Sequence, residues 1–158
     1  MASQSSDYVV LKAGEGLRLL SGPGRDLIFK VTGEDTHGAF DYFVVEVAPR
    51  GGPNLHVHHF QDEAIHVRQG RFKVRIGDSL YCVNEGGFAY LPKQVPHAFL
   101  NLTDAPGEII VVYTPGGGHK YYEELEPLRR AASPNPQKIA AVGEKYGIIV
   151  LGGPPTAD

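Results

Sequence analysis

The chain has 158 residues, a length typical of one domain with a sizeable core, and its single cysteine, Cys82, excludes an internal disulfide and fits a reducing compartment. Its formal net charge is -3, and charges of both signs are mixed along the chain, so no basic face would bind nucleic acid. No apolar run approaches the length of a membrane span, and the first residues lack a signal-peptide pattern. We therefore expect a cytoplasmic protein with no membrane or nucleic-acid partner.

Short strands are predicted from the beginning of the chain. Residues 1–7 are small and polar and should form a disordered tip. Tyr8–Lys12, Leu17–Leu20 and Asp26–Thr32 are rich in apolar residues and are separated by glycine-bearing turns, which predicts three strands. The 20 glycines and 12 prolines agree with this interpretation, because many strands joined by tight turns need them.

A longer strand is predicted over Phe40–Ala48, where apolar side chains alternate faces. Phe43, Val45 and Val47 share the face that we assign to the interior.

Two histidines and a glutamate follow in extended segments. His56 and His58 project to the same face of a strand, and two imidazoles on one face supply half of a metal site. In the next extended run, Glu63 shares a face with the apolar Ile65 and Val67. A buried carboxylate costs free energy unless a charge nearby needs it, and a divalent cation held by neutral imidazoles is such a charge. If Glu63 binds no metal, it can instead serve as a general base in a pocket.

Further strands are predicted downstream. Arg71–Ile76 alternates so regularly that one face must be buried, and a tight turn joins it to a strand over Ser79–Val83. Phe88–Leu91 adds another strand. Gly107–Thr114 is almost continuously apolar and should lie in the centre of its sheet.

A proline-bracketed loop delivers a third histidine. Pro92 and Pro96 stiffen the loop, and His97 then begins a strand on which it shares a face with Phe99 and Asn101.

Helical patterns replace strands after Tyr113. Apolar residues recur at helical spacing between Tyr121 and Leu128, although Pro127 argues against one long helix. Asn135 and Pro136 are typical of the cap and first turn of a second helix, which should end at Gly147. An edge strand over Ile148–Leu151 follows.

The site residues fall into two motifs of a known family. The spacing His-x-His-x4-Glu-x6-Gly, from His56 to Gly70, resembles the first conserved motif of the cupin superfamily. The run EGGFAYLPKQVPHAFLN at residues 85–101 resembles its second motif, whose positions are filled by Gly86, Pro92, His97 and Asn101. The chain departs from the pattern at Gln94, which stands where the family usually has glycine and must enter a turn that glycine would enter more easily. The C-terminal segment resembles that of small single-domain cupins of the quercetin-dioxygenase-like group.

The resemblance implies a fold and a ligand set. The fold is an all-β cupin double-stranded β-helix, a jelly-roll barrel over residues 8–115, on which a helical segment over residues 116–158 packs. The implied metal ligands are His56, His58, Glu63 and His97. This mixed nitrogen and oxygen set suits one divalent transition metal per chain, namely iron, manganese, nickel, cobalt, copper or zinc. Four protein ligands leave two positions of an octahedral ion open for reactants.

Apolar side chains should line the barrel next to this site. The expected substrate pocket consists of Phe43, Val45, Phe72, Phe99 and Tyr113, although plain core packing would give the same pattern. His59 and His66 lie on the opposite strand faces and should serve a surface or interface role. We expect His119 to begin a helix in contact with solvent, with a lid over the pocket as the alternative, and Tyr121 and Tyr122 to serve packing.

The resemblance implies an oxidoreductase, namely a quercetinase-like dioxygenase that contains iron or a related metal. Its substrate is expected to be a small aromatic or enolic compound of the phenolic or flavonol kind, with dioxygen as the second substrate. Glu63 is the implied catalytic group. Three alternatives stay open: a Lewis-acid isomerase, cyclase or lyase, a non-catalytic small-molecule-binding module, and a pocket that has lost its metal. A homodimer is also implied, in which N-terminal strands extend the partner's sheet.

Overall fold

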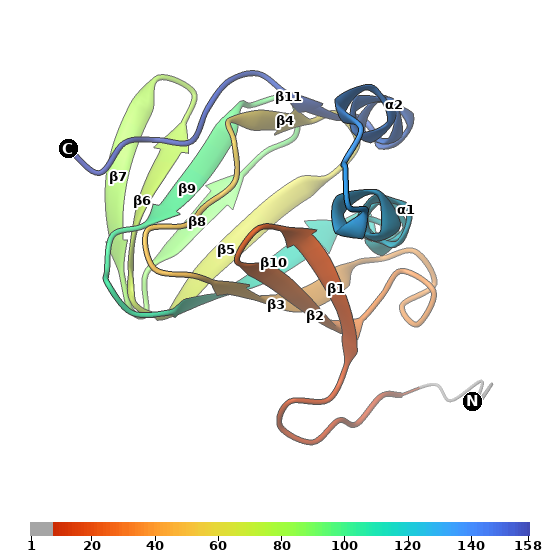
Figure 1. Cartoon of the computed structure of the whole chain (residues 1–158). Coiled ribbons are helices and arrows are strands. Elements are labelled where there is room, and N and C mark those ends of the chain that lie inside the picture. The colour runs from red at the N-terminus through yellow and green to blue at the C-terminus, as the bar shows by residue number, and fades with distance from the viewer. Residues whose placement is uncertain (1–7) are drawn as a thin grey trace.

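The computed structural model describes residues 8–158, and the predicted disordered tip at residues 1–7 lies outside this range. Two antiparallel sheets face each other and curve around a common core (Figure 1). Two short helices follow the strands, so the predicted all-β jelly-roll fold with short C-terminal helices is confirmed.

The first sheet has six strands, and the strand predicted over Gly107–Thr114 lies in its interior. The strand β10 (Gly107–Thr114) lies between β3 (Asp41–Val47) and β5 (Asp62–Gln69), as its almost continuous apolar sequence predicted. In spatial order, the strands are β1 (Leu17–Gly22), β2 (Arg25–Val31), β3 (Asp41–Val47), β10 (Gly107–Thr114), β5 (Asp62–Gln69) and β8 (Phe88–Leu91).

The second sheet has five strands, and the C-terminal strand pairs at its edge as predicted. In spatial order, the strands are β11 (Ile148–Val150), β4 (His56–His58), β9 (His97–Asn101), β6 (Arg71–Ile76) and β7 (Ser79–Asn84).

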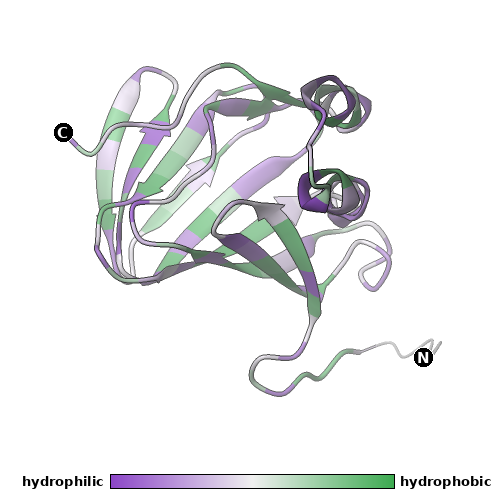
Figure 2. Ribbon diagram, viewed as in Figure 1, coloured by the Kyte–Doolittle hydropathy of each residue, from purple (hydrophilic) through white to green (hydrophobic). Residues whose placement is uncertain are grey.

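The core lies between the two sheets because alternate side chains of each strand point inward. Figure 2 shows apolar and polar residues alternating along the strands. Phe43, Val45 and Val47 are all buried, so the interior face of β3 was predicted correctly. The rings of Phe29 and Phe43 stack with centroids 4.4 Å apart, which joins β2 and β3 inside the first sheet.

The segment Tyr8–Lys12 is not a strand, so that prediction is wrong. Its side chains are exposed, with Tyr8 at 76% and Val10 at 86%. An isolated extended segment gains nothing from an apolar sequence unless a neighbouring strand accepts its backbone hydrogen bonds. Within residues 8–158, no strand pairs with it.

Both helices lie at one end of the barrel, where α1 (His119–Arg130) runs along β1 and α2 (Pro136–Tyr146) lies beside α1 and β11 (Figure 1). The caps of α2 are as predicted: the Asn135 side chain accepts a hydrogen bond from the Lys138 N–H at 3.0 Å, and Gly147 ends the helix with φ 69°. Contrary to expectation, α1 continues through Pro127.

The anchoring of α1 explains why Pro127 does not end it. Tyr121, Tyr122 and Leu125 are buried against the barrel, and the Glu126 carboxylate accepts a hydrogen bond from the Leu20 N–H of β1 at 2.9 Å. These contacts stabilise the helical conformation more than the missing backbone hydrogen bond of proline weakens it. Neither described helix has the length and apolar character needed to cross a membrane.

We propose that the chain has the two parts expected from its sequence, a barrel over residues 8–115 and a C-terminal segment over residues 116–158. The support is that strands β1 to β10 all end by Thr114 and that the helices come after them. β11 joins the two parts, because it returns to pair with β4.

Candidate metal centre

The predicted metal ligands come from three strands in two sheets. β4 carries His56 and His58, and β9 lies next to it with His97 opposite His56. β5 carries Glu63 in the other sheet. Residues 59–61 connect β4 to β5, so the chain crosses between the sheets at this point. The four side chains therefore meet where the barrel closes.

The donor atoms of these side chains gather around one point. One potential ligand atom of each residue lies within 4.8 Å of the others. Nε2 of His97 is 2.9 Å from Oε2 of Glu63, and Nε2 of His58 is 3.5 Å from the same oxygen. Donor atoms that share one ion at roughly 2.1 Å lie about 3 to 4 Å apart. The cluster thus fits a single metal ion.

Hydrogen bonds decide which ring nitrogens face the cluster. Nδ1 of His56 donates to the Asn54 carbonyl oxygen at 2.7 Å, and Nδ1 of His97 donates to the Val95 carbonyl oxygen at 3.1 Å. In each neutral ring, Nε2 then carries the lone pair that a metal needs. Both ring nitrogens of the buried His58 lack a hydrogen-bond partner among the described residues. A buried nitrogen without a partner costs free energy, and a cation at the cluster would remove that cost.

Burial and mutual charge set the protonation of the cluster. Burial lowers the pKa of His56 to about 3 and that of His58 to about 4, so both imidazoles are neutral at pH 7. Burial alone would raise the pKa of Glu63, but the charge of His97 and its hydrogen bond outweigh burial, and the pKa falls to about 2. Burial likewise opposes the charge on His97, and Glu63 reverses that effect and raises the pKa of His97. A cation would replace the proton between His97 and Glu63.

The residue in the family's usual glycine position, Gln94, has a left-handed backbone with φ 70°. Its N–H donates to the His58 carbonyl oxygen at 2.8 Å. Its side chain accepts a hydrogen bond from Nδ1 of His59 at 2.7 Å and donates to the His59 carbonyl oxygen at 3.2 Å. The left-handed conformation costs about 1 kcal/mol or more, and these bonds offset it. They also join the end of β4 to the loop before His97.

A cavity of about 460 Å³ adjoins the cluster. His56 and Glu63 line it, whereas His58 and His97 are not among its lining residues. Of the five predicted pocket residues, four line the cavity: Phe43, Val45, Phe99 and Tyr113.

The fifth predicted pocket residue, Phe72, lies outside the lining. It is completely buried and packs edge-on against Phe99, with ring centroids 5.9 Å apart. Its ring also approaches Gly107, where an added Cβ would stand 2.8 Å from Cζ. Alternation along β6 predicted the correct face, but alternation does not report the depth of a residue along the barrel.

A pair of tyrosines forms part of the cavity wall. The hydroxyl groups of Tyr113 and Tyr122 are 2.8 Å apart, and burial raises the pKa of both, so both stay protonated. One proton suffices for the bond between two hydroxyls, which leaves the other proton available to a ligand. The Tyr113 ring also contacts the cluster, since its centroid is 5.2 Å from that of His58.

Sequence reasoning missed three arginines that line the cavity, Arg25, Arg50 and Arg129. A signal existed for Arg129, because it follows Tyr122 by seven residues and Leu125 by four, and so occupies the buried face of α1. A charged residue on the apolar face of a helix merits attention. No comparable signal marks Arg25, which simply begins an apolar strand.

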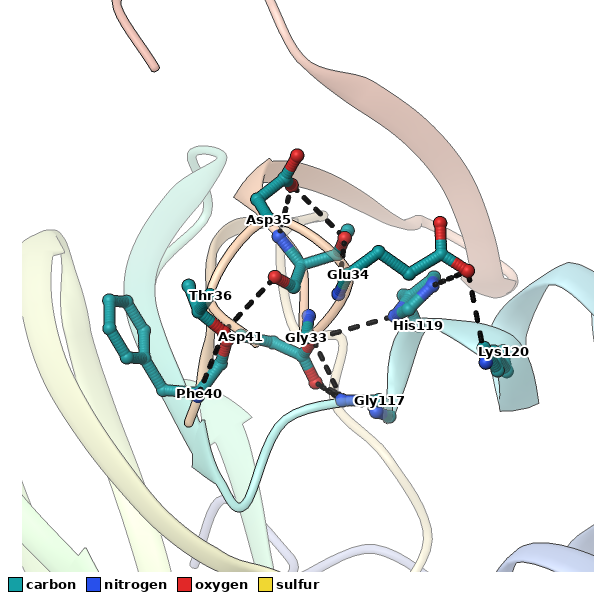
Figure 3. Close-up of polar contacts among 11 residues, drawn as sticks. Gly33, Glu34, Asp35, Thr36, Phe40, Asp41, Gly117, His119 and Lys120 are labelled. Carbon is teal, nitrogen blue, oxygen red and sulfur yellow. Dashed lines mark hydrogen bonds and ion pairs between the residues drawn. The ribbon is translucent and has the colours of Figure 1, made fainter. Parts of the chain in front are cut away.

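His119 is buried, so the expected solvated helix start is wrong. Figure 3 shows that it faces Asp41, whose carboxylate accepts hydrogen bonds from the backbone N–H groups of Gly33 at 2.6 Å and Gly117 at 3.0 Å. The Gly118 N–H donates to the same carboxylate at 2.7 Å. Nδ1 of His119 is 3.4 Å from Asp41 Oδ1. These contacts hold the start of α1 against β3, and His119 does not line the cavity.

The cavity lining does not include the remaining histidines, His37, His59 and His66, or Cys82. His66 is exposed on β5, and His59 is partly buried against Gln94. Cys82 is an exposed free thiol on β7.

Comparisons with known proteins agree with this fold. Residues 43–113 match the family model described as "Cupin domain". No curated protein matches the chain significantly. KdgF from Halomonas sp. is similar in structure, with a TM-score of 0.62 at 15% identity over 73% of this chain and 99% of that chain.

Two further similar structures have names that state a reaction, a decarboxylation and a cyclisation. A predicted oxalate decarboxylase from Thermotoga maritima has a TM-score of 0.61 at 15% identity over 67% of this chain and 98% of its own. The polyketide cyclase RemF from Streptomyces resistomycificus has a TM-score of 0.57 at 20% identity over 66% of this chain and 78% of its own. At this level of identity the likeness shows the fold. The matches support the cupin superfamily without distinguishing the quercetin-dioxygenase-like group within it.

Proposed function

Residues 43–113 match the model of a cupin domain, and on this premise we propose that the chain is a cupin, a metal-dependent dioxygenase of the quercetin-dioxygenase-like group that acts on a small aromatic or enolic compound. The observation that supports this most is the gathering of three histidines and one glutamate within 4.8 Å beside a cavity of about 460 Å³. His56, His58, Glu63 and His97 are the proposed ligands. Iron is the proposed ion, and manganese, nickel, cobalt, copper and zinc accept the same donors.

When bound, the ion would polarise a substrate hydroxyl or enol oxygen and offer an open position to dioxygen. Phe43 and Phe99 line the cavity and pack against the flat body of the substrate. Glu63 is ionised at neutral pH, which suits a metal ligand. As a base, it accepts the proton of the substrate hydroxyl only when the polarised oxygen has made that proton acidic. The Tyr113 and Tyr122 pair donates its remaining hydroxyl proton to a substrate oxygen.

The test combines elemental analysis of purified protein with dioxygen uptake on a panel of phenolic and enolic compounds. We expect about one ion per chain and one dioxygen consumed for each substrate turned over. Protein that carries no ion and gains no activity with any of the six metals would contradict the proposal and favour a binding module.

A second candidate is a reaction without dioxygen, an isomerisation, cyclisation or lyase reaction in which the ion acts as a Lewis acid. The buried Tyr113 and Tyr122 hydroxyls favour it, because such reactions need a proton donor beside the metal. Unchanged turnover under strict exclusion of dioxygen would decide for this candidate.

We also propose a homodimer in a reducing, cytoplasmic setting. Both sheets end in strands that expose apolar side chains, Leu80 at 57% and Tyr81 at 52% on β7, and Phe88 at 63% and Tyr90 at 54% on β8. Edge strands with exposed apolar side chains can pair with another chain, which supports the dimer. The free thiol of Cys82 supports the separate proposal of a reducing compartment. Light scattering after size-exclusion chromatography should give twice the chain mass, and a monomer at micromolar concentration would contradict the dimer.

A further inference from the structure

Two arginines that have no acidic partner within residues 8–158 line the cavity that also contains His56 and Glu63. Arg25 begins β2, and Arg129 lies in the last turn of α1. The arginines that do form ion pairs within residues 8–158 are Arg18, Arg50, Arg68, Arg75 and Arg130. The cavity therefore carries two positive charges that no carboxylate of the described chain offsets.

A hydrogen bond holds the Arg25 guanidinium in place, but neither guanidinium has all of its N–H donors bonded among the described residues. Arg25 donates through Nη1 to the Gly52 carbonyl oxygen at 2.6 Å. Gly22 leaves room for this side chain, because a Cβ there would stand 2.5 Å from Nη2 of Arg25. Nε of Arg25 and Nε of Arg129 are both buried without a hydrogen-bond partner among the described residues. A buried donor without an acceptor costs free energy, so these groups do not serve stability.

The two charges act on each other and on Tyr121, which lines the same cavity. Burial lowers the pKa of Arg25, and the charge of Arg129 acts in the same direction. Burial raises the pKa of Tyr121, while the charges of Arg129 and Arg25 both oppose that rise. Arginine stays protonated at any ordinary pH, so the two groups repel each other until an anion lies between them.

Other charged groups near the cavity do not neutralise this pair. Arg50 also lines the cavity, but it is paired with Asp104 at 3.0 Å. Glu63 lies within the histidine cluster, 2.9 Å from His97. The cavity lining also includes five apolar side chains, those of Leu27, Phe43, Val45, Phe99 and Val111.

We infer that this cavity binds a small compound with an apolar, aromatic body and a carboxylate group, in which Arg25 and Arg129 hold the carboxylate while the other end of the compound reaches the histidine cluster. The inference rests on the proposed function only in taking this cavity as the substrate site. An arginine fork presents two parallel N–H groups that match the two oxygens of a carboxylate. A phosphate group is typically held by clustered backbone N–H donors in addition to arginine, so phenyl phosphate serves as the competing probe.

The inference is tested by calorimetric titration of the purified full chain, with and without a chelator. The probes are 4-hydroxybenzoate and 4-hydroxycinnamate, each compared with its neutral amide, and phenyl phosphate. At least one of the carboxylates should bind ten times or more tightly than its amide. Arg129→Gln should remove most of this preference, and circular dichroism checks that the variant is folded. Arg129→Lys should keep part of the preference, because it retains the charge but not the fork.

Arg130→Gln is the matched control. Arg130 neighbours Arg129 on α1, its side chain is 60% exposed, and it pairs with Glu126, so its loss removes the same charge outside the cavity. This variant should bind every probe as the natural chain does. Four results would each overturn the inference. The chain could bind acids and amides with equal affinity, or both glutamine variants could have an equal effect. The chain could also bind none of the probes, or bind phenyl phosphate more tightly than either carboxylate.

The outcomes also separate this inference from the proposed function. A chain that prefers carboxylates in the presence of chelator, yet never takes up metal, would contradict the enzyme and keep the carboxylate site. A chain that binds metal and oxidises neutral phenols without any preference for acids would support the enzyme and contradict the carboxylate site.

Discussion

At the scale of single residues, the cluster depends on which nitrogen carries a proton. Backbone carbonyl groups fix Nδ1–H of His56 and His97, so the opposite nitrogens face inward. His58 has no such partner, and a cation is the partner that would satisfy its inward nitrogen. Replacing or protonating each of these side chains should therefore have a distinct effect on metal binding or activity.

Replacing His58 should abolish metal binding with little effect on the fold. His58→Ala removes one ligand and no hydrogen bond within the described chain, and we expect metal content to fall by about a hundredfold or more. Elemental analysis measures metal content, and circular dichroism checks the fold. His66→Ala removes an exposed imidazole from β5 and serves as the control. Equal metal content in both variants would show that His58 is not a ligand.

Metal affinity should fall in acid because a proton competes for His97. Glu63 raises the pKa of His97, while His58 stays neutral down to about pH 4 and His56 to about pH 3. Above the raised pKa of His97 the affinity should be constant. Between that pKa and about 4, one proton must leave for each ion bound, so affinity should fall about tenfold per pH unit. Chelator competition from pH 4.5 to pH 8 measures the slope, and a flat profile would exclude a His97 ligand.

Glu63→Gln should lower activity more than metal content. Glutamine keeps the shape and one ligand oxygen, but it loses the negative charge and the ability to accept a proton. We expect metal content to fall by less than tenfold and turnover by about a hundredfold or more, the range of a lost acid–base group. Parallel losses of metal and turnover would mean that Glu63 acts only as a ligand.

At the scale of elements, the position of α1 determines the far wall of the cavity. This helix carries Tyr121, Tyr122 and Arg129 to the cavity. Its N-terminus is held by the buried Asp41 carboxylate, and its last turns are held by the bond between Glu126 and the Leu20 N–H. The shape of the cavity therefore depends on Asp41, a residue that lies outside the cavity lining.

Asp41→Asn should loosen α1 and destabilise the chain. The amide can accept at one atom only, whereas the carboxylate accepts from Gly33, Gly117 and Gly118 on both oxygens. The lost charge-assisted bonds should cost about 3 kcal/mol in the free energy of unfolding. Urea denaturation measures this loss, and hydrogen exchange should show faster exchange in residues 119–130.

Asp35→Asn is the control for that variant, because Asp35 accepts its hydrogen bonds from Thr32 at the surface. It should change the free energy of unfolding by about 1 kcal/mol or less. If both variants behave alike, Asp41 does not anchor the helix.

At the scale of the whole molecule, the site joins the two sheets. His56, His58 and His97 belong to one sheet and Glu63 to the other, so an ion bound by all four would cross-link them. A cross-link of this kind stabilises the folded chain because the unfolded chain does not hold the four ligands together.

Metal should therefore raise the thermal midpoint of unfolding. An ion present at a hundred times its dissociation constant stabilises the folded state by about 2.7 kcal/mol, which corresponds to a rise on the order of 5 to 10 °C for a chain of this length. Differential scanning calorimetry with and without each metal measures the shift. The His58→Ala variant should show no shift, and a metal that raises both midpoints equally would be bound elsewhere.

The sequence alone determined the local features of this protein. Apolar runs and alternation located β1 to β10, the asparagine cap and the final glycine located α2, and the resemblance to two cupin motifs named all four residues of the cluster. These features depend on neighbours within a few residues, which the sequence displays directly. The segment Tyr8–Lys12 shows the limit, since its pattern was right for a strand and no neighbouring strand was there to pair with it.

Only the tertiary structure decided what surrounds the cluster. It placed Phe72 outside the cavity, carried α1 through Pro127, buried His119 against Asp41, and brought Arg25 and Arg129 to one cavity from positions far apart in the chain. Sequence periodicity gives the face on which a side chain lies but not its depth along the barrel or its partner from another element. Those depend on how two sheets and a helix close around a shared volume, and that closure is a property of the whole chain.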